Sequence, residues 1–178
     1  MCEPTHEVVQ SVLLRRRSVR SYQPEPIAES VLAQILEAGR QAPSAANRQP
    51  WQFVVVRDSE RKRALAEACN GQQWLADAGA IVVGLGLPSV SERWYRVDVA
   101  IAMQNMIVAS TAFGLGTCWI GAFNEDKVKE VIQAPEESRV VAITPIGVPK
   151  GDWPAGRARR ELSDVFRAET YHNPLELG

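Results

Sequence analysis

The sequence contains little of several residue types on which common protein functions depend. Of its 178 residues, only two are histidine and three are cysteine. The cysteines are far apart and form no C-x-x-C pair, which argues against a zinc site and a disulfide framework and favours a reducing cytoplasm. So few histidines also argue against histidine-based catalytic triads and metal sites. We therefore expect a cytoplasmic protein without a metal.

Neither an excess of one charge nor a long apolar run is present. Twenty Lys and Arg stand against 21 Asp and Glu, for a net charge of −1, whereas a nucleic-acid partner calls for a surplus of basic residues. The chain has no apolar run of about 18 residues and no signal-peptide layout at its start. The expectation is one domain, residues 1–178, with neither a nucleic-acid nor a membrane partner.

Hydrophobic periodicity predicts alternating helices and strands. The predicted helices are Glu7–Arg16, Glu29–Ala42, Glu60–Cys69, Glu92–Phe113 and Glu125–Gln133, and the predicted strands are Trp51–Arg57, Ala80–Leu87, Thr117–Ile120 and Arg139–Val148. Asp58 or Ser59, and Asn124, can cap the helices that follow them, and Gly114 suits a helix C-terminus. These elements indicate an α/β sandwich with four or five strands. The pattern leaves open whether the sheet is parallel or mixed.

The long helix Glu92–Phe113 has apolar residues around more than one face. A helix of this kind is buried on most sides. In a chain of this length, a second subunit is one way to supply that burial.

Two arginine clusters lie near opposite ends of the chain. The first contains Arg16, Arg17, Ser18 and Arg20, and the second contains Arg157, Arg159 and Arg160. Guanidinium and hydroxyl groups are suited to phosphate oxygens. Taken alone, the first cluster is better explained as a solvated helix end, because cations are favourable near the C-terminus of a helix, and the second as solvated surface. The two clusters could nevertheless converge on one phosphate.

Two further segments could approach a ligand. The stretch Pro43–Trp51 is bounded by prolines and displays small and amide side chains, although a plain connecting loop has the same composition. Glycines in Gly114–Phe123 would let backbone N–H groups come close to a planar ligand, but Trp119 occupies the third glycine position of a dinucleotide fingerprint and excludes that motif. Cys118 lies in an apolar context that favours a core thiol. The reactive group of an enzyme with this sequence would therefore come from a cofactor.

In this order, these segments resemble the nitroreductase family of FMN-dependent oxidoreductases. Residues 16–22 (RRSVRSY) are similar to its R-R-S-x-R-x-[FY] motif, residues 42–51 (APSAANRQPW) to its A-P-S-x-x-N-x-Q-P-W loop, and residues 114–121 (GLGTCWIG) to its G-L-G-T-x-W-I-G stretch. Residues 146–149 and 157–159 follow in the family's order. The resemblance covers about residues 8–166.

The resemblance implies an α+β fold, a three-layer sandwich in which a mostly antiparallel sheet is flanked by helices. It further implies an intertwined homodimer, with the helix Glu92–Phe113 at the interface and two FMN molecules that each contact both subunits.

The resemblance also assigns site residues. Arg16, Arg17, Ser18 and Arg20 match the motif that holds the flavin phosphate and ribityl chain, and Arg157 and Arg159 match the basic pair that closes on the same phosphate. Pro43, Ser44, Ala45 and Asn47 match the loop that the partner subunit presents to the flavin. Ile120, Gly121 and Ala122 match the turn beside the isoalloxazine ring, where a backbone N–H can reach N5. No side chain is implied as catalytic, since flavin N5 carries the chemistry.

The activity implied is ping-pong reduction of nitroaromatics, quinones or related acceptors by NAD(P)H. The segment 88–96 is short where several relatives carry a substrate lid, which implies an open pocket with Trp94 or Tyr95 as candidate walls. The alternative function is an FMN-binding carrier or sensor with little turnover. The residues give no preference between NADH and NADPH, and whether residues 72–74 contact the flavin stays open.

Overall fold

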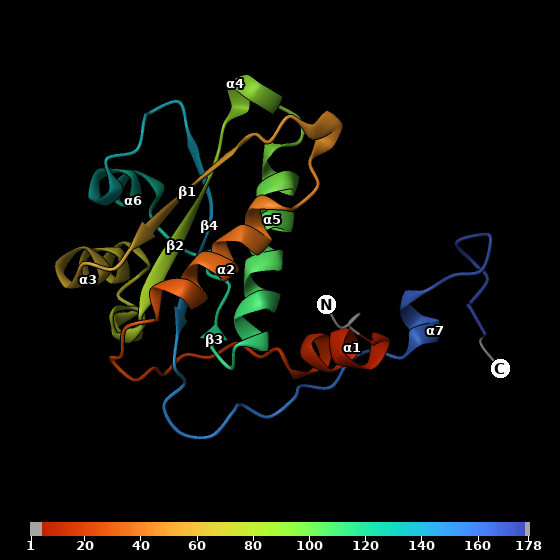
Figure 1. Cartoon of the computed structure of the whole chain (residues 1–178). Helices are drawn as coiled ribbons and strands as arrows, with labels where there is room; N and C mark the ends of the chain where they lie inside the picture. Colours follow the sequence, from red (N-terminus) through yellow and green to blue (C-terminus); the bar gives the residue numbers. More distant parts are fainter. Residues whose placement is uncertain (1–4, 177–178) are drawn as a thin grey trace.

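One antiparallel sheet forms the centre of the computed structural model, which describes residues 5–176 (Figure 1). Its strands are β1 (Trp51–Val56), β2 (Ala80–Gly86), β3 (Gly116–Thr117) and β4 (Arg139–Gly147), in the spatial order β1-β2-β4-β3. Val83 of β2 lies opposite Val54 of β1 on one side and Ile143 of β4 on the other. The antiparallel pairing settles the question that hydrophobic periodicity left open, in favour of the α+β fold.

Helices cover both faces of this sheet. They are α1 (His6–Arg15), α2 (Glu29–Arg40), α3 (Ser59–Ala68), α4 (Pro88–Ser91), α5 (Tyr95–Ala112), α6 (Glu125–Ile132) and α7 (Leu162–Val165), with short 3₁₀ turns η1 (Ala45–Asn47) and η2 (Gln73–Asp77). The boundaries of α1, α2, α3 and α6 lie within two residues of those predicted. Asp58 and Asn124 cap α3 and α6, because their side-chain oxygens accept hydrogen bonds from Arg61 N and Lys127 N.

The sheet separates two apolar cores, which confirms the three-layer arrangement. On one face, Ile81 and Val83 of β2 pack with Leu65 of α3 and Val128 of α6. On the other face, Val82, Ala142 and Ile146 of the sheet pack with Ile35 of α2 and Met103 and Met106 of α5. Alternate residues of β2 thus point to opposite cores, and the whole strand is buried.

The predicted helix Glu92–Phe113 is wrong at its N-terminus. Pro88, whose fixed φ suits the first helical position, starts the separate helix α4, and α5 begins only at Tyr95. The C-terminus agrees with the prediction, since Gly114 follows the helix with φ of +73°.

The predicted strand Thr117–Ile120 is also too long. β3 ends at Thr117, and Ile120 returns to the sheet through an isolated pair of hydrogen bonds with Ile143. The hydroxyl of Thr144 donates a hydrogen bond to the carbonyl of Cys118, 3.1 Å away. This carbonyl therefore binds a side chain of β4 instead of continuing the backbone pairing of β3.

Helices α1 and α7 lie to one side of the layered body (Figure 1). Neither helix contains a buried residue. Leu14 of α1 is 66% exposed and Leu162 of α7 is 61% exposed. In a single chain these apolar side chains therefore remain largely in contact with solvent. Within the described residues, every helix falls short of the length and apolarity that a bilayer crossing requires.

Candidate active site

The first arginine cluster lies at the edge of the sheet, directly after α1. Val19 N donates to the carbonyl of Thr117, 2.8 Å away, so the segment 18–19 runs alongside β3. Val19 itself is buried, whereas the neighbouring Ser18 and Arg20 are exposed. The alternation of a strand thus anchors one side chain in the core and directs its neighbours outward.

The second cluster reaches the same place from the other end of the chain. Both clusters line one pocket of about 580 Å³. Its lining residues are Leu13, Leu14, Arg16, Arg17, Ser18, Arg20, Pro154, Ala155, Gly156, Arg157 and Arg159. The convergence that the sequence only allowed is therefore present in the fold. Arg160 is not part of the pocket lining, and it donates instead to the carbonyl of Asp164.

Arg17 carries the clearest sign that this pocket takes an anion. Its Nη1 donates to the carbonyls of Leu14 and, at 2.8 Å, Arg16, and Gly156 lies so close that a Cβ there would stand 2.9 Å from Nη2. Its Nε is buried and has no hydrogen-bond partner among the described residues. Because an unpaired buried donor is costly, this atom fits an acceptor such as a phosphate oxygen.

The pocket also has an uncompensated positive charge. In the part of the chain that the structure describes, the ion pairs are Arg40–Glu37, Arg57–Glu29 and Lys129–Glu125, and none involves an arginine of the pocket. Nearby, burial raises the pKa of the Cys118 thiol, while Arg20, a hydrogen bond with Ser18 and Arg16 oppose that rise. Cys118 is a buried free thiol, which agrees with the predicted core position.

The loop 43–50 is strained and is held by two side chains. Ala46, Asn47 and Gln49 have φ of 51°, 52° and 51°, a region that residues other than glycine rarely occupy. The buried carboxylate of Asp98 accepts from Ala45 N at 3.2 Å and 3.3 Å, and Ser44 Oγ accepts from Gln49 N at 3.0 Å. Strain of this kind, costing about 1–3 kcal/mol per residue, persists where the surroundings enforce it and is concentrated at functional sites.

This loop and the arginine pocket lie at opposite ends of α5. Asp98 is in the first turn of the helix, whereas Val19 binds Thr117, just beyond its C-terminus. The helix rises by about 21 Å between Asp98 and its last residue, Ala112, at 1.5 Å per residue. The structure therefore does not bring Pro43, Ser44, Ala45 or Asn47 into the pocket of their own chain.

Similarity to known proteins agrees with this geometry. Two overlapping segments, residues 13–89 and 72–148, match the model of the nitroreductase family. They span more than half of the 178 residues. The chain belongs to the nitroreductase family.

Individual relatives cover nearly all of this nitroreductase-family chain. The NAD(P)H-type FMN reductase of Bacillus subtilis (strain 168) is 34% identical, over 97% of this chain and 77% of its own length. The crystal structure of a nitroreductase family protein from Clostridium novyi NT is 30% identical, with a TM-score of 0.76 over 93% of this chain and 96% of that one. The NADPH:FMN oxidoreductase of Vibrio harveyi, solved with NAD+, is 25% identical, with a TM-score of 0.84 over 96% and 80%.

The glycine-containing turn of this family member presents free backbone donors. Ile120 is buried and its N–H is taken by the carbonyl of Ile143, 2.9 Å away. Gly121 and Ala122 are exposed, and their N–H groups make no hydrogen bond within residues 5–176. Of the three residues predicted at this turn, Gly121 and Ala122 therefore have a donor available for a ligand.

Of the other candidates in this family member, Gln72, Trp74 and Tyr95 make contacts within the single chain, whereas Trp94 stays exposed. Trp74 stacks on buried Tyr22, with ring centroids 6.2 Å apart, and Gln72 donates to the carbonyl of Cys69. Tyr95 is 5% exposed and packs against Gly86, whereas Trp94 is 41% exposed. Trp94 is thus the one of the two candidate walls that a ligand could reach.

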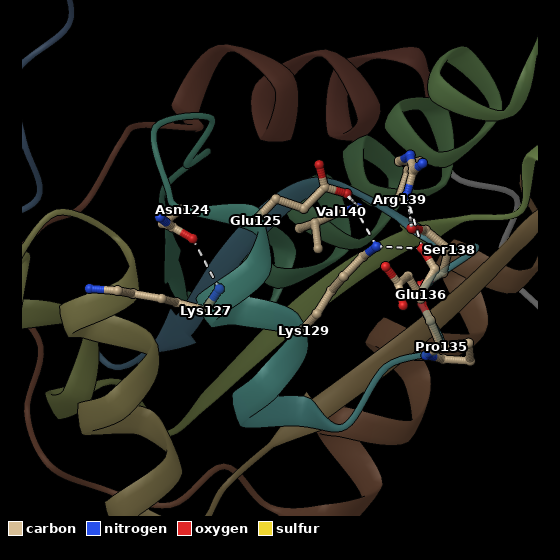
Figure 2. Close-up of polar contacts among 9 residues, drawn as sticks. All are labelled: Asn124, Glu125, Lys127, Lys129, Pro135, Glu136, Ser138, Arg139 and Val140. Atoms are coloured by element: carbon tan, nitrogen blue, oxygen red, sulfur yellow. Dashed lines mark hydrogen bonds and ion pairs between the residues drawn. The ribbon is translucent and has the colours of Figure 1, made fainter.

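A second hollow of about 870 Å³ lies beside α6 and shares no lining residue with the arginine pocket. Figure 2 shows Lys129 between Glu125 and the carbonyl of Glu136, to which its Nζ donates at 2.7 Å. Glu125 in turn accepts from Val140 N at 2.9 Å. These groups fasten α6 to the start of β4 and leave no unsatisfied donor comparable to Arg17. In the described residues, no group of His, Cys, Asp and Glu could hold a metal ion.

Sequence reasoning missed two residues that shape the site of this nitroreductase-family chain. Asp98 supports the strained loop, and its one visible signal is that it is an isolated acidic residue within the apolar run of α5. Trp153 contacts Arg15 across 138 positions of sequence. No local pattern could indicate a contact of that separation.

Proposed function

We propose that this member of the nitroreductase family is an NAD(P)H-dependent oxidoreductase that binds FMN in the arginine-lined pocket and reduces nitroaromatics, quinones or related acceptors. The observation that carries the proposal is the convergence of both arginine clusters on one pocket, with the buried Nε of Arg17 lacking a partner. The positive charge of these side chains suits the phosphate of FMN, and guanidinium groups form charge-assisted hydrogen bonds with phosphate oxygens.

Six residues hold the phosphate and ribityl chain in this proposal. They are Arg16, Arg17, Ser18 and Arg20 after α1, and Arg157 and Arg159 in the segment after β4. The first group is fixed by the strand-like pairing of Val19 with Thr117. The second group belongs to an exposed segment and completes the pocket from the other side. Two sets of donors from independent segments can surround one phosphate.

The turn 121–122 supplies donors for the ring of the flavin. FMN, when bound, supplies the redox chemistry by accepting two electrons from NAD(P)H and passing them to the acceptor. The free N–H groups of Gly121 and Ala122 would stabilise negative charge on the ring without a side-chain acid. This role requires no titrating residue, which agrees with the scarcity of histidine.

A second copy of the chain completes the site. Apolar side chains are exposed along α1, α5 and α7: Val8, Leu13, Leu14, Val97, Ile101, Leu162 and Val165. Burying such residues favours association by about 25 cal/mol per Å² of apolar surface. In the proposed homodimer, the loop 43–47 contacts the flavin of the partner subunit, because it lies too far from the pocket of its own chain.

Reduction of the protein-bound flavin tests the function. We expect the purified protein to bind FMN, and its flavin absorbance to decrease when NADH or NADPH is added without oxygen. NAD(P)H and the acceptor would occupy the same open face of the flavin in turn. Double-reciprocal plots of initial rate against NAD(P)H concentration, at several acceptor concentrations, should therefore give the parallel lines of ping-pong kinetics. Bound FMN without NAD(P)H oxidation would instead support a carrier or sensor, and a protein that fails to bind FMN would contradict both functions.

A further inference from the structure

Among the described residues, the segment that contributes the second arginine cluster is joined to the rest of the chain by one hydrogen bond. Its preceding residues are still tied to the body, since Lys150 N donates to the carbonyl of Ser21 at 3.0 Å. Beyond it, among residues 151–176, the one hydrogen bond to the remaining described residues runs from Trp153 Nε1 to the carbonyl of Arg15, 2.8 Å away. The blue segment that leads from β4 to α7 passes the end of α1 at this place (Figure 1).

The contact is suited to fixing the segment against α1. Arg15 is the last residue of α1, so its carbonyl has no partner within the helix, and the indole N–H satisfies it. The guanidinium carbon of Arg15 also lies 5.1 Å from the centroid of the Trp153 ring, a cation–π geometry. One aromatic side chain therefore binds both the backbone and the side chain of the residue that precedes the first cluster.

The position of this contact connects it to the pocket. Trp153 lies directly before the lining segment 154–157. Three residues after it, Gly156 packs against the Arg17 guanidinium, where a Cβ would stand 2.9 Å from Nη2. The indole thus fixes the segment beside α1, and the absence of a side chain at position 156 lets the backbone approach Arg17. Arg157 and Arg159 follow at once.

We propose that Trp153 is a positioning residue for the cofactor phosphate: it holds Arg157 and Arg159 opposite the cluster formed by residues 16–20. The inference rests on the proposed function, because it assumes that the pocket binds the phosphate of FMN. Trp153 does not line the pocket itself, so it acts through the arginines. Its removal should weaken the binding of ligands that carry the phosphate and leave other flavin contacts in place.

Comparison of FMN with riboflavin, which lacks the phosphate, tests this role in the full-length protein. The dissociation constants of both flavins would be measured by fluorescence titration for the wild type, Trp153→Ala and Trp153→Phe. Tyr171→Ala is the matched control, because Tyr171 is an aromatic residue of the same segment, 81% exposed, beyond α7. Thermal unfolding of each variant without flavin reports any general loss of stability.

For Trp153→Ala, we expect the Kd for FMN to rise about tenfold, since a neutral hydrogen bond and an exposed cation–π contact are both lost. The Kd for riboflavin should change less than twofold, because riboflavin lacks the phosphate. Trp153→Phe keeps the ring but lacks the N–H, so about a threefold rise for FMN alone is expected. Tyr171→Ala should match the wild type.

Equal weakening of both flavins, or an unchanged preference for FMN in Trp153→Ala, would overturn the positioning role. If Trp153→Ala does not fold, the FMN-specific loss in Trp153→Phe decides the question, and its absence rejects the proposal. A wild-type protein that binds FMN no better than riboflavin gives a different result: it refutes the phosphate pocket itself, and the inference with it.

Discussion

Replacement of Arg16 and Arg159 by alanine, singly and together, tests whether the two ends of the chain hold one phosphate. Both residues line the same pocket, although they are 143 positions apart in the sequence. A hydrogen bond to a charged group contributes about 1.5–3 kcal/mol. Each single variant should therefore raise the Kd for FMN about 10- to 150-fold. Arg159 is the more exposed of the two, so we expect its loss at the lower end of that range.

The double variant adds information that the single variants lack. Independent losses would sum to about 3–6 kcal/mol, or roughly a 10²- to 10⁴-fold increase in Kd. Residues that bind one group deviate from additivity, with coupling energies of about 0.5–3 kcal/mol. We therefore expect a measurable coupling between Arg16 and Arg159 in the Kd for FMN and none in the Kd for riboflavin.

Fluorescence titration with FMN measures these constants, and Arg160→Ala provides the control. Arg160 adjoins Arg159 but donates to the carbonyl of Asp164 and does not line the pocket. Its replacement removes the same charge and should change the Kd for FMN less than twofold. Equal effects of Arg159→Ala and Arg160→Ala would show that general positive charge, rather than contact with the phosphate, governs binding, and would refute the reasoning.

Three further predictions concern stability. Asp98→Ala leaves Ala45 N–H without its buried acceptor and should lower the free energy of unfolding in urea by about 1–3 kcal/mol. Asp98→Asn keeps an acceptor oxygen and should lower it by less; equal losses in the two variants would contradict an acceptor role. Gly86→Ala places a Cβ 2.1 Å from the Tyr95 ring and should cost about 1–3 kcal/mol by overpacking; an unchanged melting temperature would refute this clash. Burial raises the pKa of Cys69 from 9.0 to about 11, so the unfolded chain loses this proton first. Between those pH values the titration of Cys69 should lower the free energy of unfolding by about 1.4 kcal/mol per pH unit. The free energy of unfolding of Cys69→Ala should therefore fall less steeply as the pH rises.

Local sequence patterns predict most of the elements because local chemistry determines them. Asp58 and Asn124 cap the helices α3 and α6 as expected, and Gly114 ends α5 in the conformation that glycine favours. Errors arise where local signals compete. Pro88 starts a short helix ahead of α5. After Thr117 the β propensity of the sequence predicts a longer strand, but the carbonyl of Cys118 accepts a hydrogen bond from the Thr144 hydroxyl instead.

The candidate site depends on contacts that no local pattern contains. The arginine motifs predict phosphate chemistry from residue type, but the fold is needed to bring Arg17 and Gly156 together. Asp98 lies in an apolar helix where a single acidic residue suggests a surface position, and only the fold shows its carboxylate buried against Ala45. Trp153 likewise gains a role only through its contact with Arg15.

A crystal structure of the protein with FMN tests the central claim most directly. The account predicts the phosphate in the pocket after α1, with guanidinium groups of both clusters at about 2.7–2.9 Å from its oxygens. A phosphate bound elsewhere, or one contacted by only one of the two clusters, would contradict it.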